Sequence, residues 1–418
     1  MCRKKRAQVL TAMIKFPNDF LWGAATAAYQ VEGNNANCDW WKWEQDSGLK
    51  EVSGRACRHY EFYKKDFDLA QSFNHNAHRL SIEWSRIEPR QGEFSEKEIG
   101  HYKDVILALR QRNIEPIVTL HHFTNPLWFS ALGGWKNKNA HTYFLPYVEK
   151  VIEALGPDVR YWITINEPMV YIYHAYVLGV WPPQEKSLSL VKGITDNLLT
   201  AHIKAYRLIH DIYKRKKLPS VSVSIAQNLQ AFVACRPTLK NKIAVYLRDR
   251  LYNFAFIERL IRRKAIDFIG VNYYSRSLVD AEQWGYRELL LGICRHNHLP
   301  LKKNSLGWDI YPEGLGDLLR KLKKYNLSVL ITENGICTDD DNQRWEYISA
   351  HLKQVGAAID AGVKIIGYIY WSLIDNFEWD KGFGPRFGII GIDYTTYERT
   401  VRESGKKLAA VCKTGVLL

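Results

Sequence analysis

From about residue 20 onward, the chain alternates short apolar runs with longer amphipathic stretches. Residues 114–120 read IEPIVTL and residues 329–331 read VLI, so these runs are nearly continuous. Such runs are typical of parallel strands that are covered on both faces. Their alternation with helical stretches predicts βα units and not a β-sandwich or a helical bundle.

Eight candidate strands can be counted along the chain, beginning near Phe20, Asn76, Ile114, Val159, Ser220, Ile266, Leu327 and Val363. Most are followed by a helical stretch, such as residues 61–73, 140–155 and 344–361. Eight such units predict an α/β fold, a single (β/α)8 TIM barrel. We assign residues 15–418 to one catalytic barrel and residues 1–14 to an N-terminal extension. A disordered segment and an upstream start both stay open for that extension.

The composition supports one large soluble domain, since 46% of the 418 residues are hydrophobic and 24% are charged. The net charge of +14 could attract nucleic acid, but the basic residues are mostly dispersed. Their densest runs, residues 3–6 and 214–217, are short, and the second stands where a helix is expected to end. We therefore expect no nucleic-acid partner. The longest uncharged apolar run, residues 365–374, is too short to span a membrane.

The seven cysteines, at positions 2, 38, 57, 235, 294, 337 and 412, form no Cys-x-x-Cys pair. They predict neither a zinc cage nor a disulfide scaffold. The N-terminal residues lack the apolar core of a signal peptide, so a reducing cytoplasm is the expected location. No glycine-rich phosphate loop and no metal-spaced cluster is visible, and we expect no cofactor and no metal.

Polar side chains gather at the predicted C-terminal ends of the strands, where TIM barrels carry out catalysis. They are Arg79, His122, Asn166, Glu167, Asn228, Asn272, Glu333, Asn334 and Trp371. Glu167 and Glu333 each end an apolar strand, the fourth and the seventh. A protonated and an ionised carboxyl on opposed strands could together open a glycosidic bond. Spacing along the sequence leaves open whether the outcome is retention or inversion.

Several motifs, in order, resemble those of the family 1 glycoside hydrolases along nearly the whole chain after Lys15. Residues 20–33 read FLWGAATAAYQVEG, similar to the N-terminal signature of the family, and residues 330–337 read LITENGIC, similar to its nucleophile signature. Further agreement comes from HRLSIEW at 78–84, LHHF at 120–123, NEP at 166–168, NYY at 272–274 and YWSLIDNFEW at 370–379.

This resemblance implies a role for each matching residue. Glu167 would be the general acid/base and Glu333 the nucleophile, supported by Arg79, Tyr274 and Asn272. The residues expected to bind the cleaved sugar are Gln30, His122, Asn166, Trp371, Glu378 and Trp379. Trp135, His174, Trp181 and Trp345 are candidates for the leaving-group (aglycone) side. The implied activity is that of a retaining exo-β-glycosidase acting on terminal glucosyl, galactosyl or fucosyl residues, with the oligomeric state open.

The chain also departs from the family pattern. Phe123 stands where many relatives have tryptophan, and the stretches 274–307 and 337–344 are short, which predicts a more open aglycone side. Residues 34–45 resemble the archaeal, heat-tolerant branch. Two other readings remain: a 6-phospho-β-glycosidase, which Glu378 disfavours by repelling phosphate, and a non-catalytic barrel that binds glycans or a protein, which the two glutamates disfavour.

Overall fold

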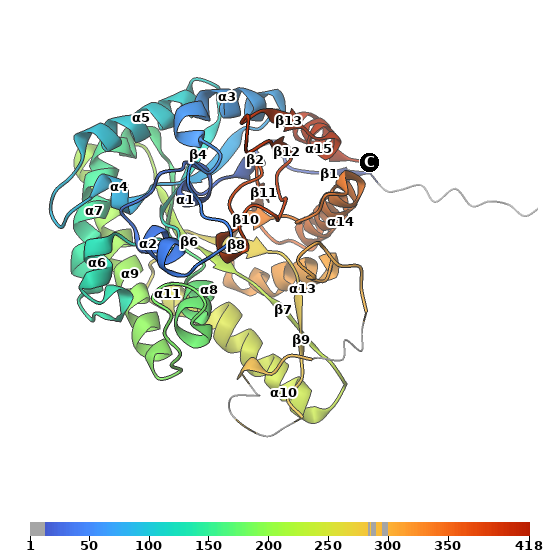
Figure 1. The fold of residues 1–418 in the computed structure, drawn as a ribbon. Coiled ribbons are helices and arrows are strands. Elements are labelled where there is room, and N and C mark those ends of the chain that lie inside the picture. The colour runs from blue at the N-terminus through green and yellow to red at the C-terminus, as the bar shows by residue number, and fades with distance from the viewer. Residues whose placement is uncertain (1–12, 283–284, 286–289, 295–299) are drawn as a thin grey trace, which may run out of the picture.

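Eight parallel strands form a closed barrel in the order β10-β11-β2-β3-β4-β5-β6-β8 (Figure 1). The computed structural model describes residues 13–282, 285, 290–294 and 300–418. The barrel strands are β2 Leu21–Ala25, β3 Ala77–Ser81, β4 Glu115–His121, β5 Tyr161–Asn166, β6 Ser222–Asn228, β8 Phe268–Tyr273, β10 Ser328–Asn334 and β11 Ile365–Trp371. Each begins within two residues of its predicted start. The prediction of a (β/α)8 TIM barrel is confirmed.

Amphipathic helices cover the outside of the barrel (Figure 1). The longer ones are α3 His59–Ser72, α5 Glu96–Arg110, α7 Ala140–Leu155, α9 Leu190–Lys216, α11 Ala255–Arg262, α13 Pro312–Leu322, α14 Asp341–Asp360 and α15 Glu403–Thr414. Helix α9 ends at the basic run 214–217, as predicted, where cations complement the helix dipole. Among the described residues, no helix has an apolar stretch long enough to cross a membrane.

The remaining elements connect these strands and helices. The remaining helices are α1 Ala28–Val31, α2 Asp39–Asp46, α4 Trp84–Ile87, α6 Leu127–Ala131, α8 Pro168–Ile172 and α10 Leu239–Arg248, with π-helical turns η3 Tyr173–Leu178 and η4 Asp249–Phe254. The short strands are β1 Ile14–Lys15, β7 Ala231–Ala234, β9 Arg276–Val279, β12 Ile390–Ile392, β13 Arg399–Val401 and β14 Val416–Leu417. Strand β1 pairs with β14, so Ile14 belongs to the folded unit although we assigned it to the extension.

The inside of the barrel is filled by one buried cluster to which every strand contributes a residue. These are Ala25, Ala77, Ile117, Ile163, Ala226, Phe268, Leu330 and Ile369. A second and larger core lies between the strands and the surrounding helices. The strands are therefore buried on both faces, which explains their nearly continuous apolar sequences. Because the centre is packed, only the strand ends are left to form a site.

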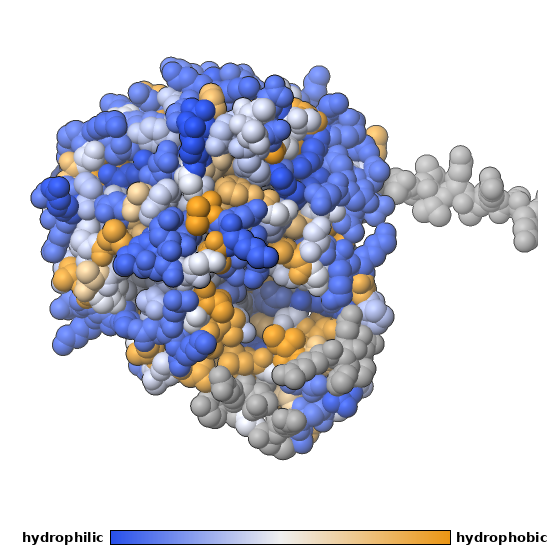
Figure 2. All heavy atoms as spheres, in the orientation of Figure 1, coloured by the Kyte–Doolittle hydropathy of each residue, from blue (hydrophilic) through white to orange (hydrophobic). Residues whose placement is uncertain are grey.

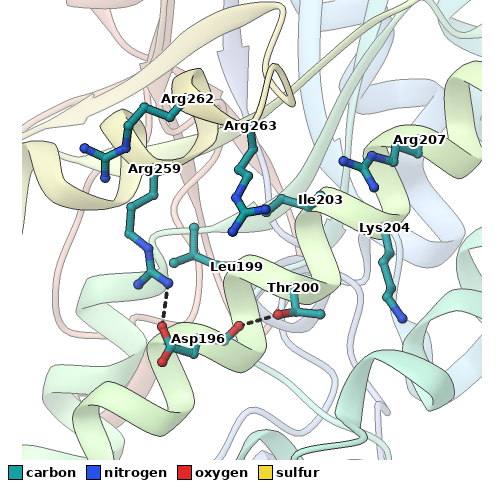
Figure 3. Close-up of a pocket in the computed structure, with 9 residues that line it drawn as sticks. All are labelled: Asp196, Leu199, Thr200, Ile203, Lys204, Arg207, Arg259, Arg262 and Arg263. Atoms are coloured by element: carbon teal, nitrogen blue, oxygen red, sulfur yellow. Dashed lines mark hydrogen bonds and ion pairs between the residues drawn. The ribbon is translucent and has the colours of Figure 1, made fainter.

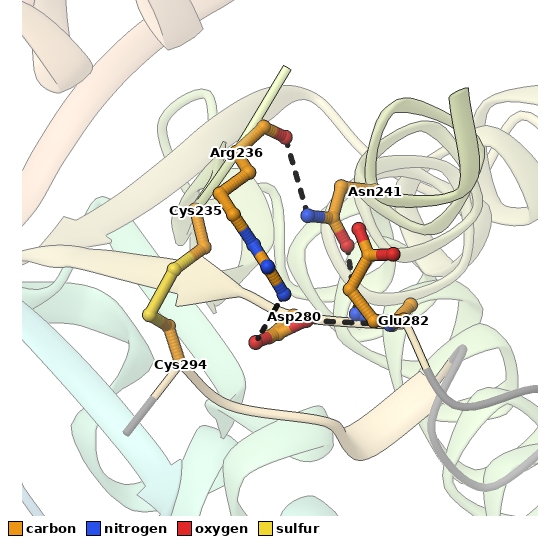
Figure 4. Close-up of a disulfide and its surroundings, with 7 residues drawn as sticks. Cys235, Arg236, Asn241, Asp280, Glu282 and Cys294 are labelled. Carbon is orange, nitrogen blue, oxygen red and sulfur yellow. Dashed lines mark hydrogen bonds and ion pairs between the residues drawn. A yellow bond between two sulfur atoms is a disulfide. The ribbon is translucent and has the colours of Figure 1, made fainter. Parts of the chain in front are cut away.

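One disulfide, Cys235–Cys294, lies beside the two-stranded sheet β7–β9 (Figure 4). The backbone N–H groups of both cysteines donate to carbonyls of β9, those of Val279 and Leu278, and this pairing brings residues 59 positions apart together. The sequence indicated no disulfide scaffold, and this one disulfide was missed because spacing along the chain does not reveal the pairing. Asp280 and these two cysteines are residue types that can bind a metal, and they lie close together. Because the two sulfurs are joined in the disulfide, the Asp280 carboxylate is the only anionic ligand of these three residues. The cytoplasmic location stays a prediction.

Candidate active site

The strands that carry the two glutamates, β5 and β10, both become irregular at their C-terminal ends. The pairing register shifts between Ile163 and Asn166 in β5 and between Ile331 and Asn334 in β10. Such bulges redirect side chains and often lie next to active sites. Glu167, just after β5, also has a φ of 43°, a left-handed conformation that costs a non-glycine residue free energy and is often retained at functional sites.

Glu333 is held by a cation and a phenol. Arg79 Nη1 donates to Glu333 Oε1 at 2.5 Å, and Tyr274 Oη donates to Glu333 Oε2 at 2.5 Å. Arg79 is 1% exposed, so this ion pair is shielded from water. Burial raises the pKa of Glu333 above its ordinary value, while the Arg79 charge and the Tyr274 hydrogen bond act to lower it. These contacts favour the ionised form of Glu333.

Among the described residues, the side chains that hydrogen-bond to the Glu167 carboxyl are neutral amides. Asn228 Nδ2 and Asn272 Nδ2 donate to Glu167 Oε1 at 3.0 Å and 2.9 Å. Burial raises the pKa of Glu167 to about 8, and the nearby charge of Glu333 adds to this shift. Burial is the larger of these two causes. Glu167 therefore holds a proton near neutral pH.

A hydrogen-bond network joins the two glutamates. Asn166 Oδ1 accepts a hydrogen bond from Arg79 Nη2 at 2.6 Å and another from Asn272 Nδ2 at 3.2 Å. Arg79 also donates to Glu333, and Asn272 also donates to Glu167. Asn166 Nδ2 lies 3.2 Å from His122 Nε2. Burial lowers the pKa of His122 well below its ordinary value, so this ring is neutral. The network fixes both carboxyl groups on one rigid wall.

The other side of the site offers hydroxyl-binding groups and flat rings. Gln30 Nε2 donates to Glu378 Oε2 at 3.3 Å, while Gln30 Oε1 is buried with no hydrogen-bond partner in the described structure. Burial, followed by the charge of Glu333, raises the pKa of Glu378 to about 8. The His122 ring lies nearly parallel to those of Trp371 and Trp379, with centroids 6.1 Å away in each case. An unpartnered buried oxygen beside aromatic faces suits a polyhydroxylated ring.

A cavity of about 880 Å³ opens between these groups. Most of the predicted site residues line it, namely Gln30, His122, Asn166, Glu167, His174, Trp181, Tyr274, Glu333, Trp371, Glu378 and Trp379. Arg79 and Asn272 lie behind the wall and reach the cavity through the carboxyl groups that they hold. His174 stacks on Trp181 at a centroid distance of 4.3 Å.

Two predicted residues are not at the site. Trp135 is fully buried in the core, where its ring packs on Phe129 and its Nε1 donates to Asn125 Oδ1 at 2.9 Å. Trp345 lies on α14 with Lys407 Nζ 5.9 Å from its ring centroid, away from the cavity lining. The aglycone prediction is wrong for both, because aromatic residues that fill a core look the same in sequence as those that line a cleft.

The structure also shows contacts that the sequence did not single out. Asn228 was visible as a polar residue at a strand end, but its bond to Glu167 was not. Gly335 lies inside the motif LITENGIC at 330–337, and the sequence analysis assigned it no role of its own. A Cβ atom at this position would lie 1.8 Å from the carbonyl oxygen of Trp371, so only glycine lets the end of β10 approach β11 this closely.

A second pocket, of about 370 Å³, lies between α9 and α11 (Figure 3). Its lining includes five cations, Lys204, Arg207, Arg259, Arg262 and Arg263, and one acid, Asp196, which accepts from Arg259 at 2.5 Å. Residues dispersed along the sequence thus gather in space, which the sequence analysis missed. The pocket contains no paired carboxyls and is not a second catalytic site of the same kind. The absence of a nucleic-acid partner stays a prediction.

Known proteins resemble the chain over nearly its whole length. The model of the family described as glycosyl hydrolase family 1 matches residues 12–262 and 247–416. A 1,4-beta-D-glucan glucohydrolase of Thermotoga neapolitana is 32% identical, with 97% of this chain and 100% of that protein covered. A 6-phospho-beta-galactosidase of Clostridium acetobutylicum is 30% identical, covering 94% and 96%. The structure of a beta-glycosidase from Pyrococcus horikoshii superposes with a TM-score of 0.91 at 38% identity, covering 97% of each chain.

Proposed function

Because the chain belongs to glycosyl hydrolase family 1 and is a β-glycosidase, we propose that it removes terminal β-D-glucosyl, β-D-galactosyl and β-D-fucosyl residues. The observation that carries the catalytic assignment is the unequal environment of two carboxyls on one cavity. Glu333 is paired with a cation, whereas Glu167 has a pKa of about 8. Pairs of carboxyls with separated pKa values are what retaining glycosidases use.

In this mechanism the Glu333 carboxylate attacks the anomeric carbon while Glu167 donates its proton to the leaving oxygen. The glycosidic bond breaks and an ester between the sugar and Glu333 forms. Esterification removes the negative charge of Glu333, which contributes to the raised pKa of Glu167. Glu167 then accepts a proton from water, the water oxygen bonds to the anomeric carbon, and Glu333 leaves as a carboxylate. Two inversions give net retention.

The sugar is placed by groups that line the same cavity as the catalytic pair. Gln30 Oε1 and the Glu378 carboxyl accept hydrogen bonds from neighbouring hydroxyls, and Asn166 reaches the 2-hydroxyl. Trp371 is the stacking floor. Phe123 contributes no N–H donor here, so the grip on the sugar is looser than tryptophan would give. This supports tolerance of epimers at the 4-position and a broad exo specificity.

A 6-phosphorylated sugar is the competing substrate, because one relative is named a 6-phospho-beta-galactosidase. Phosphate would have to lie near the Glu378 carboxyl, which would repel it above the Glu378 pKa of about 8 and offers it no positive charge at any pH. Lys381 also lines the cavity, but it already pairs with Asp380 at 2.6 Å. A carboxyl at this place and a lysine already paired with an acid favour a sugar without phosphate.

A panel of nitrophenyl glycosides tests the proposal. We expect turnover of the β-glucoside, β-galactoside and β-fucoside, with little turnover of β-glucoside 6-phosphate or of α-anomers. Proton NMR of the first product should show the β-anomer of the free sugar. An α-anomer as first product would rule out the double displacement, and a preference for the phosphorylated substrate would replace the sugar assignment.

A further inference from the structure

The second pocket, between α9 and α11, has a lining unlike that of the catalytic cavity. Figure 2 shows apolar residues gathered around a hollow on one face, over the part of the molecule where Figure 1 draws α8, β7 and β9. The second pocket is instead rich in positive charge, and we call it the cationic pocket, defined by Lys204, Arg207, Arg259, Arg262 and Arg263. Of these five residues only Arg259 also lines the catalytic cavity, so the cationic pocket is a separate cavity.

One face of each helix builds the cationic pocket. Its lining on α11 consists of Arg259, Arg262 and Arg263, and side chains three or four positions apart share a helix face. The same spacing relates the lining residues on α9, which are Asp196, Leu199, Thr200, Ile203, Lys204 and Arg207. Figure 3 shows cations extending from both helices, with Leu199 and Ile203 between the two sets. The helix packing therefore gathers positive charge over a small apolar floor.

The one acid in this lining does not neutralise the charge. Asp196 pairs with Arg259 at 2.5 Å and with Lys192 at 3.0 Å, so its carboxylate already has two cationic partners. Within the part of the chain that the structure describes, the other four cations of the pocket form no ion pair. Like charges that are held together repel one another. The pocket therefore favours an anion that carries several charges.

Phosphoryl groups match this set of cations. The planar guanidinium of arginine donates two parallel hydrogen bonds to phosphate oxygens. A phosphate monoester carries a charge of about −1.5 to −2 at pH 7, so two phosphoryl groups offset four cations and one leaves about half of the charge. The pocket volume of about 370 Å³ suits a small molecule and not a strand of nucleic acid.

We propose that the cationic pocket binds a small molecule with two phosphoryl groups, the diphosphate group being the simplest case. Inorganic pyrophosphate and the diphosphate end of a nucleotide share this chemistry, and pyrophosphate and ADP are the probes that separate these two sources. The site does not rest on the proposed function, because its readout is binding and not hydrolysis.

Isothermal titration calorimetry of the full chain tests the site. We expect one pyrophosphate to bind per chain with a Kd below about 100 µM, a Kd for inorganic phosphate at least about tenfold higher, and an affinity that falls as salt is added. A Kd for ADP at or below that of pyrophosphate supports a nucleotide as the source. Weaker binding of ADP supports inorganic pyrophosphate.

One variant on each helix locates the bound anion. Arg207→Gln on α9 and Arg263→Gln on α11 should each raise the Kd for pyrophosphate about tenfold, through loss of a charge-assisted hydrogen bond. Arg215→Gln is the matched control and should leave the Kd unchanged, because Arg215 lies on α9, is 59% exposed and does not line the pocket. The melting temperature of the unaltered protein, in pyrophosphate against sulfate at equal ionic strength, reads binding without any variant.

Four results would overturn the proposal or part of it. No heat of binding and no rise in melting temperature at millimolar pyrophosphate would remove the site. An equal loss of affinity in Arg215→Gln would remove the anion from this pocket. Citrate that binds as tightly as pyrophosphate would overturn the phosphoryl assignment. A single-stranded oligothymidylate that binds more tightly per phosphate would replace the small molecule by a nucleic acid.

Discussion

The surroundings of Glu333 and Glu167 differ although both side chains are buried on the same cavity wall. Around Glu333 lie a guanidinium and a phenol, both donating to the carboxylate at 2.5 Å. Around Glu167 lie two primary amides, at 3.0 Å and 2.9 Å, and the described part of the chain shows no ion pair with this carboxyl. Burial raises the pKa of both groups. The Arg79 charge is the first cause that lowers the pKa of Glu333, whereas at Glu167 it comes after the hydrogen bonds from Asn272 and Asn228.

The difference teaches how one residue type supplies two chemistries. A charged donor favours the form of the carboxyl that can attack carbon, whereas neutral donors leave the buried carboxyl able to keep a proton. This contrast can be tested by replacing Glu333, then Glu167, and then single hydrogen-bond donors to each glutamate.

The largest effect on activity should come from removing Glu333, the ionised glutamate. Glu333→Gly should lower kcat by a factor on the order of 10⁵ or more, because no group remains to form the covalent intermediate. Sodium azide should restore part of the activity by occupying the vacated space, and the product should be the α-glycosyl azide. A rescued product in the β-configuration would remove Glu333 from the role of nucleophile.

The effect of removing Glu167, the proton donor, should depend on the substrate. Glu167→Gln should lower kcat/KM for alkyl glucosides by roughly 10²–10⁴, the usual contribution of a general acid. Dinitrophenyl glucoside, whose leaving group needs no proton, should still form the glycosyl-enzyme and give a burst of dinitrophenol. Glu346→Gln, on an exposed part of α14, is the matched control. Equal losses for both substrates would contradict proton donation by Glu167.

The wild-type pH profile should show both carboxyls as two limbs. kcat/KM requires Glu167 protonated and Glu333 ionised. It should therefore fall above about pH 8, where Glu167 loses its proton, by up to tenfold per pH unit. It should also fall on the acid side, at a pH above the ordinary 4.5 of a glutamate. Glu378 also has a pKa of about 8, so Glu167→Gln decides between them: an alkaline limb that persists in this variant belongs to Glu378.

The smallest effects should come from single donors and have different signatures. Tyr274→Phe removes a hydrogen bond that lowers the pKa of Glu333, so the acid limb should move up and kcat/KM at pH 6 should fall about tenfold. Asn228→Ala removes a hydrogen bond that lowers the pKa of Glu167, so the alkaline limb should move up with a loss of only about two- to fivefold. The first variant narrows the pH range and the second widens it. If both limbs of the pH profile shift by the same amount in both variants, the two carboxyls titrate as one unit.

The sequence predicted the barrel and most of its rim because both depend on local patterns. Parallel strands buried on two faces leave continuous apolar runs, and polar residues that end such runs must lie at one edge of the sheet. The pairing of Cys235 with Cys294 and the gathering of Lys204 with Arg262 depend on contacts between distant segments, and nothing local marks them. Trp135 illustrates the same limit, since its ring fills the core with no signature that separates it from Trp371.

The missing side chain at Gly335 restricts how this enzyme can diversify. Position 335 joins the segment of Glu333 to the backbone of Trp371 at a spacing that even a methyl group would disrupt. A saturation library at this codon should return glycine alone among active clones. New substrate preferences are then more accessible through other residues of the cavity lining, such as Val191 and Leu251, than through position 335.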